Sequence, residues 1–115
     1  EPMARRVEWL MDVVNDLGLD NVMIHQARAE ELRGKGKADV VTARAVANMS
    51  KLVRMTSKLI APGGALVALK GRRAPIEVEE ASGELRRHHL RAQIHEVPSI
   101  MEEESTYVVV CTRIR

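Results

Sequence analysis

The stretch LIAPGGALVALKG (residues 59–71) decides the fold class of this chain. It contains the turn-forming residues Pro62, Gly63 and Gly64, followed by the uninterrupted apolar run 65–69. Such a run is typical of a strand that is buried on both faces of a parallel sheet. We therefore predict a helix that ends at the Pro-Gly-Gly turn and a buried strand at residues 65–69.

An alternation of helix and strand patterns extends from this stretch in both directions. Apolar residues recur at helical spacing in the segments 2–17, 28–32, 49–60 and 75–88. Strands are predicted at residues 21–26, 39–43, 65–69, 90–97 and 106–114. The last two strands are expected to form an antiparallel hairpin across the glutamate-rich link 98–105. This order predicts a doubly wound α/β fold, in a single domain spanning residues 1–115.

The composition narrows the classes of function. The formal net charge is only +2, so the overall charge balance does not by itself indicate a nucleic-acid partner. The single cysteine, Cys111, lies in an apolar run and excludes a disulfide framework, which fits a reducing, cytoplasmic setting. No apolar run approaches the ~18 residues of a membrane span. The four histidines have no metal-ligand spacing to carboxylates or cysteine, so we predict no metal site.

Two cationic residues follow predicted parallel strands directly. Arg44 comes after the strand 39–43, and Lys70 comes after the strand 65–69. Ligands of open α/β sheets bind at this carboxyl edge. A ligand contact or a salt bridge to a nearby acid would each account for Arg44. With Arg72 and Arg73, Lys70 forms a cationic loop that either holds RNA phosphate or is simply solvated.

Five motifs along the chain resemble one protein family. They are EPMARRVEWL (1–10), RAEE (28–31), VTARAVA (41–47), LIAPGG (59–64) and ALKG (68–71). Each motif alone is weak, but their joint appearance in this order resembles the bacterial small-subunit ribosomal RNA guanine-N7 methyltransferases. The resemblance covers nearly the whole chain.

The resemblance implies a Rossmann-like fold of the class I S-adenosyl-L-methionine-dependent methyltransferases. In that fold, strand 1 and the glycine-rich loop that holds the cofactor, with most of strand 2, would precede Glu1. The sheet is therefore expected to be incomplete. A domain without those strands exposes apolar surface, so we expect the fragment to be unstable or to self-associate, and to be inactive on its own.

The resemblance also implies a cofactor site for S-adenosyl-L-methionine. Glu1 would bind the ribose hydroxyls, because a carboxylate can accept two hydrogen bonds from a cis-diol. Ala29 and Glu30 would lie against the adenine, and Arg44 would complete the cofactor-binding set. The alternatives are a solvated terminal glutamate for Glu1 and ordinary first-turn helix acids for Glu30 and Glu31.

RNA contact is expected from a cationic patch made of Arg5, Arg28, Lys70 and Arg72. The expected partner is 16S rRNA or the small ribosomal subunit. Guanine N7 carries no proton, so its methylation needs positioning and electrostatics rather than a general base. No catalytic residue is therefore assigned. A small-molecule methyltransferase of the same fold, or a non-enzymatic α/β interaction module, stays open as an alternative.

Overall fold

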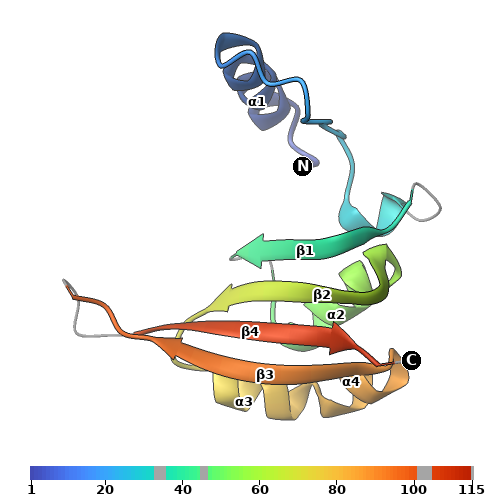
Figure 1. Cartoon of the computed structure of the whole chain (residues 1–115), viewed down its shortest axis with the longest axis vertical. Helices are drawn as coiled ribbons and strands as arrows, with labels where there is room; N and C mark the ends of the chain where they lie inside the picture. Colours follow the sequence, from blue (N-terminus) through green and yellow to red (C-terminus); the bar gives the residue numbers. More distant parts are fainter. Residues whose placement is uncertain (33–35, 45–46, 101–104, 115) are drawn as a thin grey trace. The chain divides into compact units, whose positions relative to one another are not determined.

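The computed structural model describes residues 1–32, 36–44, 47–100 and 105–114, and the chain divides into two compact units (Figure 1). The first unit comprises residues 1–33, and the second comprises residues 34–115. The expectation of a single domain over the whole chain stays a prediction.

The first unit contains helix α1 (Ala4–Asp16). The helix starts two residues later and ends one residue earlier than predicted, and Gly18, which follows its C-cap Leu17, has a positive φ of 63°. There the N–H groups of Gly18 and Leu19 donate to the carbonyls of Asn15 and Val14. These paired hydrogen bonds form a Schellman ending, which favours glycine at the left-handed position.

Residues 21–26 do not form the predicted strand. None of the strands among the described residues pairs with this segment, and backbone without a neighbouring strand cannot build a ladder. Its apolar side chains are correspondingly open, with Met23 80% exposed. The segment leads into the 3₁₀ helix η1 (Ala29–Leu32), which confirms the helical turn predicted at 28–32.

The second unit is built on a four-stranded sheet of order β1-β2-β4-β3 (Figure 1). The strands are β1 (Ala38–Arg44), β2 (Ile60–Lys70), β3 (Leu90–Val97) and β4 (Thr106–Arg113). Strands β1 and β2 are parallel, whereas β4 is antiparallel to both β2 and β3. The predicted closing hairpin is confirmed, although residues 101–104 of its link lie outside the described part of the chain.

Strand β1 is an edge of this sheet, although its apolar composition is typical of a buried strand. Its side chains are exposed or half-buried, and Val40 is 57% exposed. Val41 and Ala43 do pack against the core. One face of β1 therefore packs against the core, whereas its other face and its outer edge are uncovered.

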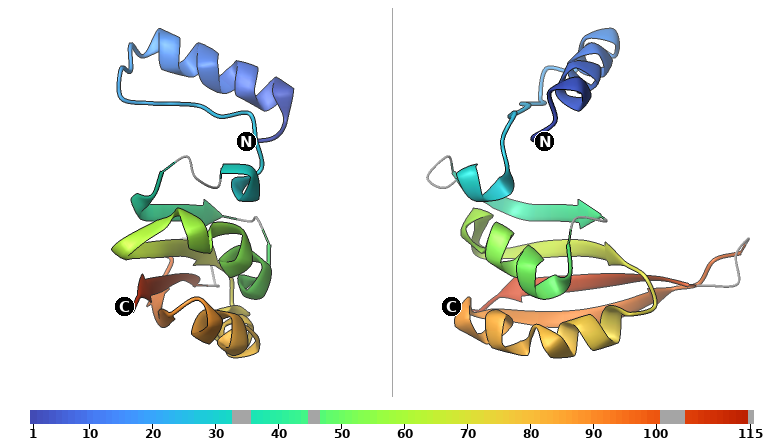
Figure 2. Two further views of the ribbon diagram at one scale, coloured as in Figure 1. Left: turned by 90° about the vertical axis from the view of Figure 1, so that its right-hand side faces the viewer. Right: turned by 180° about the vertical axis from the view of Figure 1, so that it is seen from behind.

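The helices α2 (Met49–Thr56), α3 (Ala74–Glu80) and α4 (Ser82–Arg87) all cover one face of the sheet (Figure 2). The predicted end of the helix 49–60 is wrong. Helix α2 and the short η2 (Ser57–Leu59) end before Ile60, which already pairs with β1. The helix predicted at 75–88 is interrupted at Ala81, before Ser82 and Gly83, which are poor helix formers.

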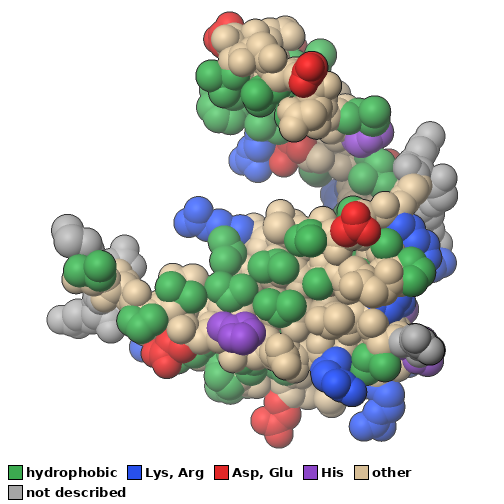
Figure 3. Space-filling model, viewed as in Figure 1, with side chains coloured by type: hydrophobic (Ala, Val, Ile, Leu, Met, Phe, Trp, Pro, Cys, Tyr) green, Lys and Arg blue, Asp and Glu red, His purple; other side chains and the backbone are tan. Residues whose placement is uncertain are grey.

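The core lies between these helices and the sheet. Buried side chains from α2 pack against buried residues of β2 and β4, namely Met49, Leu52, Val53, Ile60, Leu66, Ala68, Val109 and Cys111. Alternation along each strand places the remaining apolar residues on the opposite face. That open face carries Val40, Ala65, Val67, Leu69, Val108 and Val110 in adjacent register. Figure 3 shows hydrophobic side chains gathered over the sheet there.

The Pro-Gly-Gly motif lies inside β2 and does not end a helix. Ala38 pairs with Ile60 but Val40 pairs with Ala65, so β2 carries extra residues between these two pairs. Gly63 has a positive φ of 77°, which accommodates the resulting bend. A Cβ at Gly64 would lie only 2.8 Å from the carbonyl oxygen of Asp39 on β1.

We expect Gly64→Ala to lower the free energy of unfolding by about 1–3 kcal/mol, because the new methyl group must displace backbone atoms. Gly71→Ala is the matched control, since a Cβ there meets nothing within 4 Å. Urea denaturation of both variants measures the effect. Equal midpoints for the two substitutions would contradict the steric explanation.

Candidate functional site

The carboxyl ends of β1 and β2 form the candidate site of the second unit. Parallel pairing brings Arg44 into register with Leu69, so the ends of both strands lie side by side. A depression of about 510 Å³ opens there, lined by Arg44, Leu69, Lys70, Gly71 and Thr106. The structure therefore brings the predicted residues Arg44 and Lys70 together at the sheet edge where α/β folds bind ligands.

Lys70 differs from the expected loop cation. It is the last residue of β2, its side chain is only 10% exposed, and its ammonium lies 3.1 Å from Oε1 of Glu77 on α3. The ammonium also donates a hydrogen bond to the carbonyl oxygen of Ala47. The role of Glu77 as its partner was missed from the sequence, although a lysine that ends a buried strand requires a counter-charge.

Arg72 and Arg73 lie in the exposed turn after β2. Arg73 reaches Glu80 at 3.9 Å, with both side chains well exposed, so this pair contributes little to stability. Arg44 is exposed as well. The turn thus presents guanidinium groups to solvent beside the depression at the strand ends.

In the first unit, Glu1 lies against the segment that leads to η1. Its terminal ammonium donates to the carbonyl oxygens of His25, at 3.2 Å, and Ala27, at 3.3 Å. Its carboxylate accepts from the Met3 N–H at 3.1 Å and pairs with Arg6 at 3.5 Å. A carboxylate has about four acceptor positions, so these contacts leave capacity for a further hydrogen-bond donor.

The predicted adenine-contact residues lie in η1 of the same unit. Ala29 and Glu30 are both half-buried. The preceding Arg28 is exposed, and its backbone N–H donates to Oε1 of Glu31 at 3.3 Å, which holds the start of the turn. Arg5 is exposed in the first turn of α1. The structure therefore places Glu1 close to the start of η1, through its contact with Ala27.

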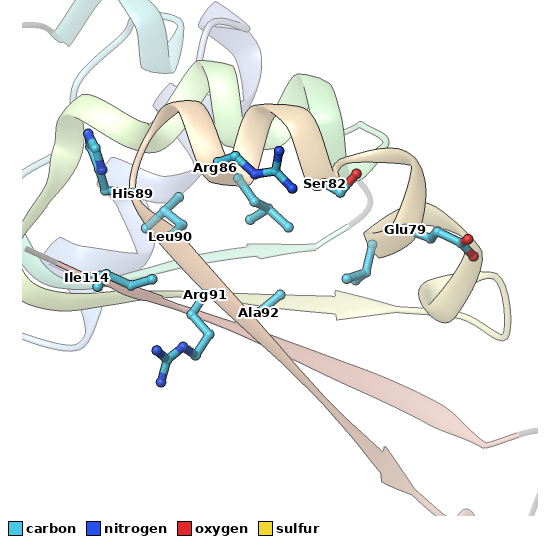
Figure 4. Close-up of a pocket in the computed structure, with 10 residues that line it drawn as sticks. Glu79, Ser82, Arg86, His89, Leu90, Arg91, Ala92 and Ile114 are labelled. Carbon is cyan, nitrogen blue, oxygen red and sulfur yellow. The ribbon is translucent and has the colours of Figure 1, made fainter.

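A second depression, of about 540 Å³, lies between the helices α3 and α4 and strand β3 (Figure 4). Its apolar lining consists of Val78, Leu85, Leu90, Ala92 and Ile114. Arg86, Arg91 and Glu79 also line it. Leu90 pairs with Arg113, at the opposite edge of the sheet from Arg44. This groove is therefore separate from the ends of the parallel strands.

Two further observations concern reactive groups. Among the described residues, no group of three or more His, Cys, Asp or Glu side chains is arranged to hold a metal ion. Cys111 is buried in the core, and burial raises the pKa of its thiol to about 11. A thiol of this kind is a poor nucleophile at neutral pH.

In the described part of the chain, no helix is both long and apolar enough to cross a membrane.

Comparison with known proteins identifies the family. Residues 1–108 match the family described as GidB, rRNA small subunit methyltransferase G. The chain belongs to this family. A GidB relative, the ribosomal RNA small subunit methyltransferase G of Beutenbergia cavernae, is 47% identical over 110 residues, which cover 95% of this chain and 52% of that protein. The chain spans about half the length of the curated relatives it matches.

Solved structures confirm the predicted fold class. An rRNA methylase from Streptococcus thermophilus superposes with a TM-score of 0.71 at 13% identity, covering 100% of this chain and 71% of the other. TYW2 of M. jannaschii, solved in complex with AdoMet, gives 0.71 at 16% identity, covering 99% and 56%. This member of the GidB family therefore has the Rossmann-like class I methyltransferase fold.

The buried thiol predicts an alkaline loss of stability. Burial raises the folded-state pKa of Cys111 from 9.0 to about 11, so the folded protein holds this proton more tightly. This difference stabilises the folded protein fully below pH 9. The free energy of unfolding then falls by up to about 3 kcal/mol as the pH rises through 11. Urea denaturation between pH 8 and 11 measures it, and Cys111→Ala is the control. An equal pH dependence in both proteins would contradict the assignment.

Proposed function

We propose that the whole protein containing this chain transfers a methyl group from S-adenosyl-L-methionine to N7 of a guanine in 16S rRNA. Membership of the GidB family over residues 1–108 carries this proposal. The exposed Arg44, at the carboxyl ends of parallel strands, supports it, because this is the ligand-binding edge of α/β sheets. The proposed location is the cytoplasm, and the proposed partner is 16S rRNA or the small ribosomal subunit.

The proposed cofactor contacts are Glu1, Ala29, Glu30 and Arg44. Glu1 offers a carboxylate with remaining acceptor capacity for the ribose hydroxyls. The small side chain of Ala29 allows a flat ring to approach the backbone closely. Arg44 supplies a fixed positive charge to the carboxylate of the methionine moiety, through a charge-assisted hydrogen bond.

The proposed reaction requires no general acid or base. The N7 lone pair attacks the methyl carbon, the C–S bond of the sulfonium breaks, and the positive charge moves from sulfur to the guanine ring. No proton is transferred in this step, so the work of the protein is alignment and electrostatic stabilisation.

RNA contact is proposed for Arg5, Arg28 and Arg72, which are all exposed. Arginine pairs with phosphate bidentately, so its removal weakens binding for any RNA sequence. Lys70 is left out of this set because its ammonium is paired with Glu77 and largely buried. RNA binding that rests on arginine–phosphate contacts is expected to weaken steeply with salt.

Methyl transfer tests the proposed function. The whole protein, with radiolabelled S-adenosylmethionine, is expected to label 16S rRNA, and the product is expected to show the chain cleavage by borohydride and then aniline that marks N7-methylguanine. Arg44→Met is expected to raise the KM for S-adenosylmethionine about tenfold or more, because one charge-assisted hydrogen bond is lost. Arg91→Met, an exposed arginine at the opposite edge of the sheet, is the matched control. Absence of label in RNA, or label only in small molecules, refutes the proposal.

We also propose that the 115-residue chain self-associates through the open face of its sheet. Val40 and Leu69 on this face are 57% and 40% exposed, and an apolar surface of this kind favours association. Sedimentation velocity over a concentration series is expected to show oligomers. The double variant Val40→Thr/Leu69→Thr should reduce them, whereas Ile76→Thr, on helix α3, should not. A chain that stays monomeric at every concentration contradicts this proposal.

A further inference from the structure

The ammonium of Lys70 has two partners from different elements. It lies 3.1 Å from Oε1 of Glu77, where the two side chains are only 10% and 16% exposed. It also donates to the carbonyl oxygen of Ala47, in the connection between β1 and α2. A charged pair at this depth is maintained only when both groups have further hydrogen-bond partners. Ala47 supplies that partner for the lysine.

Glu77 likewise has a second partner, at the start of α2. The same Oε1 atom accepts a hydrogen bond from the backbone N–H of Met49, at 3.1 Å. Met49 is the first residue of α2, and its N–H has no acceptor within the helix. The Asn48 side chain caps the same helix end by accepting from the Lys51 N–H at 2.9 Å. A side chain from α3 therefore completes the cap of α2.

Together these bonds hold residue 47 and the start of α2 against the end of β2 and against α3. Lys70 binds the carbonyl oxygen of Ala47, and Glu77 accepts from the N–H of Met49. Residues 47 and 49 both lie within five residues of Arg44, and Lys70, which binds residue 47, lines the depression at the strand ends.

We propose that Lys70, acting with Glu77, is a positioning residue for the cofactor site and not a ligand of RNA phosphate. Its charge is already neutralised by Glu77, and its donors point to a carboxylate and a carbonyl oxygen of the protein. Its effect on the reaction passes to Arg44 through Leu69, which precedes Lys70 in β2 and pairs with Arg44 on β1, so this inference rests on the proposed function of Arg44. The lysine and the glutamate cannot exchange places, because Ala47 offers a hydrogen-bond acceptor and Met49 a donor.

Amide hydrogen exchange tests the anchoring independently of activity. In the whole protein, Lys70→Met and the milder Glu77→Gln are expected to speed exchange over residues 47–52 by roughly fivefold or more, the effect of losing a helix cap. Lys58→Met, at an exposed lysine in η2, is the matched control and should leave exchange unchanged. Unchanged exchange in both Lys70→Met and Glu77→Gln overturns the proposal.

Kinetics separate positioning from RNA binding. Lys70→Met is expected to raise the KM for S-adenosylmethionine by about 10- to 100-fold, because small misplacements of binding groups are costly. The KM for RNA and its salt dependence should stay as in the unsubstituted protein. A salt slope lowered by about one, with an unchanged KM for S-adenosylmethionine, would identify Lys70 as a phosphate ligand and overturn the proposal.

The reversed pair gives a further discrimination. Lys70→Glu combined with Glu77→Lys restores a simple ion pair but opposes an acid to the Ala47 carbonyl and an ammonium to the Met49 N–H. We expect this double variant to stay as defective as Lys70→Met, and full rescue overturns the proposed anchoring. If the unsubstituted protein labels no RNA, the proposed function fails, while hydrogen exchange still decides whether Lys70 and Glu77 hold residue 47 and the start of α2.

Discussion

The parallel pairing of β1 with β2 is the constraint on which the second unit depends. The two strands approach closely at Gly64, which faces the carbonyl oxygens of Asp39 on β1 and of Ala61 on its own strand. Only a residue without a side chain fits there, and the bend at Gly63 absorbs the extra residues of β2. This pairing aligns Arg44 with Leu69 and so creates a ligand-binding edge from two separate parts of the sequence.

The helices stabilise this pairing from one side. Met49, Leu52 and Val53 of α2 are almost fully buried against the sheet, together with residues of β2 and β4. Removal of this much apolar surface from water is the main favourable term in folding. The opposite face keeps Val40 and Leu69 accessible, which is why the unit combines a well-packed core with a surface suited to association.

A cation binds backbone carbonyl oxygens at each end of β2, one of the two inner strands of the sheet. At the carboxyl end of β2, Lys70 and Glu77 compensate each other and engage the backbone of the neighbouring connection. Near the beginning of β2, Arg113 of β4 donates to the carbonyl oxygens of Ile60 and His88, at 3.2 and 3.1 Å. Both cations therefore serve the fold. Arg72 and Arg73, in the turn after Lys70, are exposed on the surface.

The sequence by itself determined the fold class, the closing hairpin and the helical turn at residues 28–32, because apolar spacing and turn residues act locally. Its motifs also indicated the family correctly. Only the tertiary structure decided that residues 21–26 pair with none of the strands in the described part of the chain, that β1 is an edge, and that Pro62–Gly64 lies within β2. It also decided that Lys70 meets Glu77 and not solvent. These outcomes depend on which segments become neighbours, and neighbours set hydrogen bonding, burial and charge compensation in a way that no local pattern records.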